Sequence, residues 1–221
     1  MYQREISYFE AGSILREYVK DPKTIAHSYR VSFESMDFAS RHRLVGIDCN
    51  VEMAGIGGLL HDIGKEWRIH REKIVRIIPD QSAIGIFDEP DIHPVIGGEI
   101  LEKIGLPQYG EIARTHGLAE ELRMTHGIPG DFTPKTLCQK IVAYADFRVI
   151  NTRPTSINQR IECLQGAYES KKSWEKLRNL QNAIPRIKDL ERELMELWSK
   201  STYLRTYADD VKEFVENQNK N

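Results

Sequence analysis

The chain contains few cysteines and none of the spacings that cysteine-based sites require. Cys49, Cys138 and Cys163 lie far apart, and no CxxC pair occurs. This disfavours both a zinc ribbon and a disulfide framework. A run of about 18 apolar residues is also missing, and the N-terminus carries no apolar segment typical of a signal peptide. These absences predict a cytoplasmic protein in a reducing compartment, without a membrane partner.

An excess of charge of one sign is missing as well. Lys and Arg total 31 and Asp and Glu total 33 among 221 residues, which gives a formal net charge of −2. The chain as a whole is therefore not attracted to nucleic acid or to a membrane surface, although a local basic pocket is compatible with this balance. The length corresponds to one medium-sized domain, or to one domain with an appendage.

Strand-like alternation is nearly absent, whereas helical periodicity recurs along most of the chain. Asp21-Pro22 and Thr133-Pro134 each combine a capping residue with a proline at the first helical position, and each predicts a helix start. Asn50 is expected to cap a glycine-rich helix whose small residues permit close approach by its neighbours. The expected helices cover about 22–41, 50–64, 91–105, 109–117, 133–150, 156–170 and a segment after Pro185. A short helix is expected over 72–78, and a loop with some helical turns over 117–131.

The last third of the chain is expected to form a helical extension. Proline disfavours helix in the residue before it, so Thr152-Arg153-Pro154 predicts a break between a core over 1–152 and an extension over 153–221. In the extension, apolar residues recur every three to four positions at Ile187, Leu190, Leu194 and Leu197. This stripe predicts packing against the core or against a second subunit, and it favours a homodimer slightly over packing within one chain.

Histidine and aspartate side chains lie on or beside the apolar faces of five predicted helices, including the stretch GGLLHDIGK over 57–65. They are His27, His61, Asp62, His93, His116 and Asp146. A carboxylate on an apolar face is costly unless it is paired or bound to a metal, and a single histidine on such a face is usually a satisfied core residue. One metal site inside a helical bundle would account for all six residues together. Imidazole and carboxylate ligands favour Fe, Mn, Zn or Co over metals that prefer thiolates.

The order of these residues resembles the HD-domain superfamily of metal-dependent phosphohydrolases, whose signature is H…HD…D. His27, His61, Asp62 and Asp146 match that signature, and His93 and His116 resemble the additional histidines of its dinuclear branches. The residues that flank these positions also resemble those of the superfamily, in the stretches IAHSYRV, LLHDIGK, HPVIGGEIL, IARTHG and VAYADFRV. The resemblance covers about residues 23–150.

The resemblance implies an all-α fold with divalent metals held between helices. By analogy Asp62 would bridge two ions, with His27, His61 and Asp146 on one ion and His93 and His116 on the other. Fe or Mn is expected, and Zn, Co, Ni or Mg would also fit. The chemistry would be hydrolysis of a phosphate ester or phosphoanhydride by a metal-activated water, with Asp62 as a proton acceptor.

A polyanionic substrate needs cations besides the metals. Lys65 lies one turn beyond His61 and is the first candidate, in a catalytic and a substrate-binding role. Arg30, Arg148 and His126 are further candidates for substrate contacts, although a surface role accounts for each of them more simply. His42 and His70 are expected on the surface.

Within the superfamily, the resemblance is greatest to small HDIG proteins, one group of which hydrolyses dinucleoside tetraphosphates. The GYP loop of the cyclic-di-GMP phosphodiesterases is absent. The expected partner is therefore a small phosphorylated compound, most simply a nucleotide, and nucleic acid is disfavoured. Two alternatives stay open: a mononuclear 5′-nucleotidase-like enzyme that uses only H…HD…D, and a metal-stabilised helical scaffold with little turnover.

Overall fold

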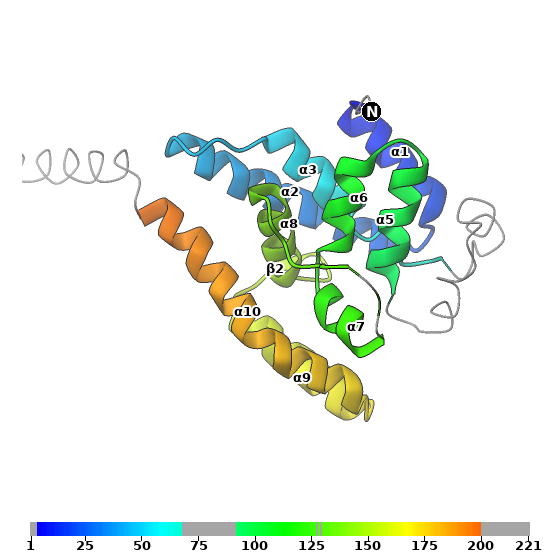
Figure 1. The fold of residues 1–221 in the computed structure, drawn as a ribbon, viewed down its shortest axis with the longest axis vertical. Coiled ribbons are helices and arrows are strands. Elements are labelled where there is room, and N and C mark those ends of the chain that lie inside the picture. The colour runs from blue at the N-terminus through cyan, green and yellow to red at the C-terminus, as the bar shows by residue number, and fades with distance from the viewer. Residues whose placement is uncertain (1–3, 68–91, 127, 129, 200–221) are drawn as a thin grey trace, which may run out of the picture.

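The computed structural model describes residues 4–67, 92–126, 128 and 130–199 (Figure 1). The expected helix over 72–78 and His70 lie outside this part. Helices dominate the described part of the chain, as predicted, and its two short strands form one hairpin. The helices are α1 (Tyr8–Tyr18), α2 (Pro22–Leu44), α3 (Val51–Leu60), α5 (His93–Lys103), α6 (Pro107–Arg114), α7 (Ala119–His126), α8 (Leu137–Phe147), α9 (Ile157–Ser170) and α10 (Trp174–Ser199), and the strands are β1 (Val149–Ile150) and β2 (Arg153–Pro154). No helix of this part is long and apolar enough to cross a membrane.

Side-chain caps set the starts of the helices that carry the site. The Asp21 carboxylate accepts hydrogen bonds from the backbone N–H groups of Lys23 and Thr24, so α2 begins at Pro22 as predicted. The expected start of α8 at Thr133-Pro134 is wrong. Its cap is Thr136, which forms a reciprocal capping box with Gln139 and moves the first helical residue to Leu137.

The core is built around α2, which packs against both α3 and α8, while α1 lies on α3 and α5 lies along α6 (Figure 1). The prediction that small residues permit close approach is confirmed at Gly58. A Cβ atom added there would lie 2.9 Å from the Cα atom of Ser32 in α2, closer than carbon atoms pack. The helix that ends at the HD pair therefore lies directly against the helix that carries His27.

The C-terminal helix is longer than expected. The predicted start after Pro185 is wrong, because α10 begins at Trp174 and continues through that proline. Burial on both sides of Pro185 holds the helix together: Ala183, Ile187 and Leu194 are fully buried and belong to the same hydrophobic cluster as the N-terminal helices. The apolar stripe is therefore accounted for by packing within one chain, and α9 lies alongside α10 (Figure 1).

The surface position expected for His42 is also wrong. Its side chain is fully buried, and its Nδ1 atom lies 2.8 Å from the carbonyl oxygen of Phe38 and 3.1 Å from Nε1 of Trp198. Trp198 belongs to α10, which covers this end of α2. Burial of His42 is thus a consequence of the long-range docking of the C-terminal helix.

Candidate metal centre

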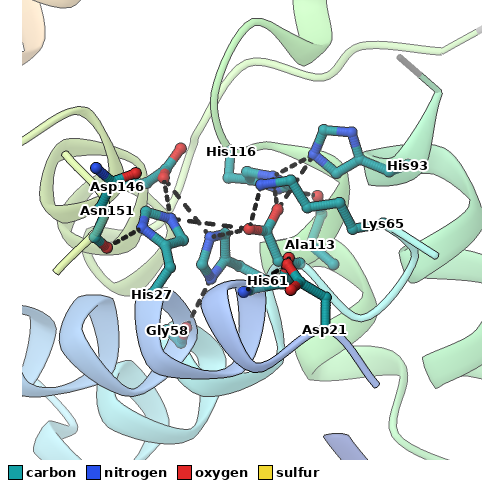
Figure 2. A network of polar contacts seen from close by, with 12 residues as sticks. Asp21, His27, Gly58, His61, Lys65, His93, Ala113, His116, Asp146 and Asn151 are labelled. Atoms are coloured by element: carbon teal, nitrogen blue, oxygen red, sulfur yellow. Dashed lines mark hydrogen bonds and ion pairs between the residues drawn. The ribbon is translucent and has the colours of Figure 1, made fainter. Parts of the chain in front are cut away.

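Six side chains from residues 27 to 146 converge within the helical core. Figure 2 shows the four histidine rings turned toward one another. The residues are His27 in α2, His61 and Asp62 directly after α3, His93 at the start of α5, His116 after α6 and Asp146 in α8. The structure thus brings together all six residues that the sequence singled out.

Asp62 lies at the centre, and its two carboxylate oxygens face different histidines. Oδ2 lies 3.4 Å from Nε2 of His61 and 3.7 Å from Nε2 of His27. Oδ1 lies 3.2 Å from Nε2 of His93 and 3.5 Å from Nε2 of His116. One carboxylate therefore stands between two pairs of imidazoles.

Asp146 completes the first of these groups. Its Oδ1 atom lies 3.0 Å from Nε2 of His27 and 3.6 Å from Nε2 of His61. The ligand atoms of His27, His61 and Asp146 all lie within 4.8 Å of one another, as do those of His61, Asp62 and His116. On the other side, the Nε2 atoms of His93 and His116 are 3.1 Å apart.

Backbone carbonyls fix the orientation of three of the rings. Nδ1 of His27 lies 2.9 Å from the Asn151 carbonyl, Nδ1 of His61 lies 2.7 Å from that of Gly58, and Nδ1 of His116 lies 2.6 Å from that of Ala113. Because a carbonyl only accepts hydrogen bonds, each Nδ1 carries the proton. In the neutral ring Nε2 then holds a lone pair directed into the cluster, which is the arrangement of metal-binding histidines.

The donor set fits a divalent metal. Nε2 of His61 is buried and has no hydrogen-bond partner in the described structure, which an ion at this point would correct. Two ligands each about 2.1 Å from one ion are separated by about 3.0–3.4 Å at angles of about 90–110°. The nitrogen-to-oxygen separations in the cluster, 3.0–3.7 Å, are close to this range. The cluster can therefore hold metal.

The carboxylates also control the protonation of the cluster. Burial alone lowers the pKa of His61, but Asp62 and Asp146 outweigh it and raise the pKa to about 10. Burial raises the pKa of Asp62, yet His61 and Lys65 hold it well below its usual range. Burial also lowers the pKa of His93. The metal-free cluster thus keeps its carboxylates charged.

Lys65 contacts the centre directly. Its Nζ atom lies 2.7 Å from Oδ2 of Asp62, and 44% of its side chain is exposed. Burial lowers the pKa of Lys65, but Asp62 and then Asp146 raise it overall, while the charge of Arg160 acts in the lowering direction. Lys65 is therefore a cation at the mouth of the centre.

A pocket of about 320 Å³ opens above the cluster. It is lined by five of the six clustered residues, His61 lying beneath them, and by Lys65. Two elements outside the expected core, α9 and α10, form part of its wall. A cavity of this size suits a small molecule.

Two predicted substrate residues lie elsewhere. Arg30 is paired with Glu34, one turn further along α2. The Nε atom of Arg148 donates to the Thr155 carbonyl at 2.9 Å, and its guanidinium lies over the Phe38 ring. Neither arginine lines the pocket. The side chain of His126 lies outside the described part of the structure.

Several pocket residues were not predicted. Lys23 and Thr24 line it, and their positions one turn before His27 on α2 were a usable signal in the sequence. Arg160 in α9 and Lys176 and Asn179 in α10 also line it. Nothing local in the sequence pointed to these three, because the docking of two distant helices brings them there.

Comparison with known proteins agrees with this geometry. An uncharacterized protein of Methanocaldococcus jannaschii is 31% identical over 162 residues, which cover 71% of this chain and 83% of that protein. A tRNA (cytidine(56)-2'-O)-methyltransferase of Picrophilus torridus is 32% identical over 153 residues, 67% of this chain but only 36% of that enzyme. No solved structure matched significantly. The HD domain family matches residues 24–147, more than half of the chain and all six clustered residues, and the chain therefore belongs to the HD domain family.

Proposed function

We propose that the chain is a metal-dependent phosphohydrolase that cleaves a phosphoester or phosphoanhydride bond of a nucleotide or a related small phosphate compound. The observation that carries this proposal is the position of Asp62, with one oxygen toward His27 and His61 and the other toward His93 and His116. A carboxylate placed in this way suits two ions, most simply Fe or Mn, and two ions suit phosphoryl transfer.

The divalent ions would supply a water of lowered pKa and would offset the charge of a phosphoryl group. The chain's own residues then have separate tasks. Asp62 accepts a proton from the attacking water at its carboxylate. Lys65, with Nζ 2.7 Å from that carboxylate, binds a phosphoryl oxygen and stabilises the charge that grows on it. The buried rings and carbonyls keep this arrangement fixed before substrate binds.

The size of the pocket supports a small substrate over a polymer. A volume of about 320 Å³ is at the lower end of the range of about 300–1,000 Å³ for small-molecule sites. The formal net charge of −2 likewise gives the chain no general attraction to nucleic acid.

Metal analysis combined with one isosteric variant tests the proposal. Protein purified anaerobically without chelator is expected to contain close to two ions per chain and to release phosphate from members of a panel of nucleotides and dinucleoside polyphosphates. Asp62→Asn is expected to bind less metal and to lower turnover by at least about 10³-fold while the fold persists. Trace turnover that is the same in both proteins would contradict an enzymatic role and leave a metal-stabilised scaffold. One ion per chain with full activity would instead favour the mononuclear alternative.

A further inference from the structure

Two helices beyond the family match, α9 and α10, form part of the pocket wall. On α9, Arg160, Leu164 and Tyr168 line the pocket at intervals of four residues and so share one helix face. On α10, Lys176 and Asn179 line it at an interval of three. The wall thus combines cations, an amide, an aliphatic residue and an aromatic one.

Two hydrogen-bond donors on this wall have no partner in the described structure. They are Nε of Arg160 and Nδ2 of Asn179, and both atoms are buried. Asn179 is only 3% exposed, and its Oδ1 atom already accepts a hydrogen bond from Oγ1 of Thr125 at 3.0 Å, which leaves the amide N–H₂ to face a ligand. Because unsatisfied buried donors are costly, both favour a ligand that carries acceptor oxygens.

The charges of the residues that line the pocket also favour an anionic ligand. The described residues that line the pocket include the cations Lys23, Lys65, Arg160 and Lys176, whereas the acids among them are the two carboxylates of the metal cluster. Arg160 and Lys65 line the same pocket, so their positive charges repel each other. Two neighbouring cations that repel each other become favourable when an anion lies between them.

We propose that Arg160 and Asn179 bind a second phosphoryl group of the substrate, adjacent to the one held at the metal centre, so that the substrate is a phosphoanhydride such as a nucleoside di- or polyphosphate. This inference rests on the proposed phosphohydrolase function. Leu164 and Tyr168, on the same face of α9, then contact the apolar or aromatic part of the substrate. Specificity for the second phosphoryl group comes from the C-terminal helices, and the chemistry comes from the HD core.

The test compares two hydrolysis-resistant probes by calorimetry on the metal-loaded full chain. Methylenediphosphonate offers two neighbouring phosphonyl groups, whereas methylphosphonate offers one. Arg160→Gln is expected to weaken the binding of methylenediphosphonate by about tenfold or more, and the binding of methylphosphonate by less than about twofold. Arg178→Gln is the matched control. It removes the same charge from an exposed position of α10, next to Asn179 but outside the pocket, and should change neither affinity.

A second variant keeps the inference testable if Arg160→Gln does not fold. Asn179→Asp retains the acceptor for Thr125 but replaces the unpaired amide donor with a carboxylate oxygen. It should weaken the binding of methylenediphosphonate more than the binding of methylphosphonate. Unchanged affinities in the folded variants, or equal losses for both probes, would overturn the second-phosphoryl site. This result differs from failure of the proposed function, in which metal-loaded wild-type protein neither binds methylphosphonate nor releases phosphate from any nucleotide.

Discussion

The Nδ1 atom of His27 donates a hydrogen bond to the backbone carbonyl of Asn151 at 2.9 Å, across 124 positions of sequence. Asn151 occupies the left-handed region, with φ of 56°, in the turn that joins β1 to β2. That hairpin directly follows α8, whose Asp146 lies 3.0 Å from the other ring nitrogen of His27. A single supersecondary unit therefore holds both sides of one imidazole.

Substitutions at Asn151 should separate backbone geometry from side-chain chemistry. Asn151→Gly keeps the carbonyl and tolerates the positive φ, so metal affinity should stay within about twofold of the wild type. Asn151→Val makes that conformation costly by about 1–2 kcal/mol and should lower both the melting temperature and the metal affinity. Thermal melts and metal titrations measure both effects. A large loss of affinity in the glycine variant would show instead that the amide side chain matters.

Gly64 is expected to be essential for placing His93. A Cβ atom added to Gly64 would lie 2.2 Å from the His93 carbonyl oxygen and 2.6 Å from the backbone nitrogen of Gly97. Neither atom can move without shifting α5, so Gly64→Ala should destabilise the fold by about 1–3 kcal/mol and reduce the bound metal. Denaturant unfolding and metal analysis report the two losses.

Gly166 is the matched control for this substitution. It lies inside α9, and an added Cβ atom would meet nothing within 4 Å. Gly166→Ala should leave metal content unchanged and stabilise the protein by up to about 1 kcal/mol through helix propensity. Equal behaviour of the two variants would mean that packing against α5 does not constrain Gly64.

Metal binding should depend on pH through His61. In the metal-free protein Asp62 and Asp146 outweigh the effect of burial and raise the pKa of His61 to about 10, so the ring is protonated near neutral pH. A metal binds the neutral ring, and binding must therefore release this proton. Affinity should fall by about tenfold for each unit that the pH drops from 9 to 7 because of this group alone. Competition titrations at several pH values measure the slope, and a flat profile would contradict the assignment.

Substitution of Lys65 should lower activity but not stability, whereas substitution of Arg148 should lower stability but not activity. Lys65→Gln removes the cation beside Asp62 and should lower kcat/KM by about 10- to 100-fold with little change in stability. Arg148→Gln loses the hydrogen bond to the Thr155 carbonyl and the contact with the Phe38 ring, and should cost about 1–2 kcal/mol of stability while kcat/KM stays unchanged. Steady-state kinetics and thermal melts distinguish the two. Reduced kcat/KM in folded Arg148→Gln would place that arginine in the substrate site.

Local spacing was enough to predict most helices and the six clustered residues, because a His or Asp among apolar residues at helical spacing is visible in the sequence. It was a poor guide to the pocket cations. Arg30 lies three residues after His27 and is captured by Glu34, whereas Lys23 lies four residues before His27, closer to the same face, and does line the pocket. The presence of Arg160 and Asn179 in the pocket could not be predicted from the sequence, since their positions depend on how α9 and α10 dock.

The two errors at element boundaries have different causes. Thr133-Pro134 has the composition of a helix start, but the capping box of Thr136 with Gln139 satisfies more backbone donors and prevails. Pro185 has the composition of a helix break, but burial of Ala183 and Ile187 on either side outweighs the lost hydrogen bond. Local capping decided the first case, and tertiary packing decided the second.

The pairing of His27 with Asp146, and the placement of α9 and α10 over the pocket, have a consequence for synthesis on the ribosome. The first candidate ligand emerges early, but its carboxylate partner follows 119 residues later. The wall of the pocket follows later still, with Arg160 and Asn179. A nascent chain that has exposed only its first half therefore has histidines without Asp146, and we expect any metal affinity to arise before substrate selectivity as translation proceeds.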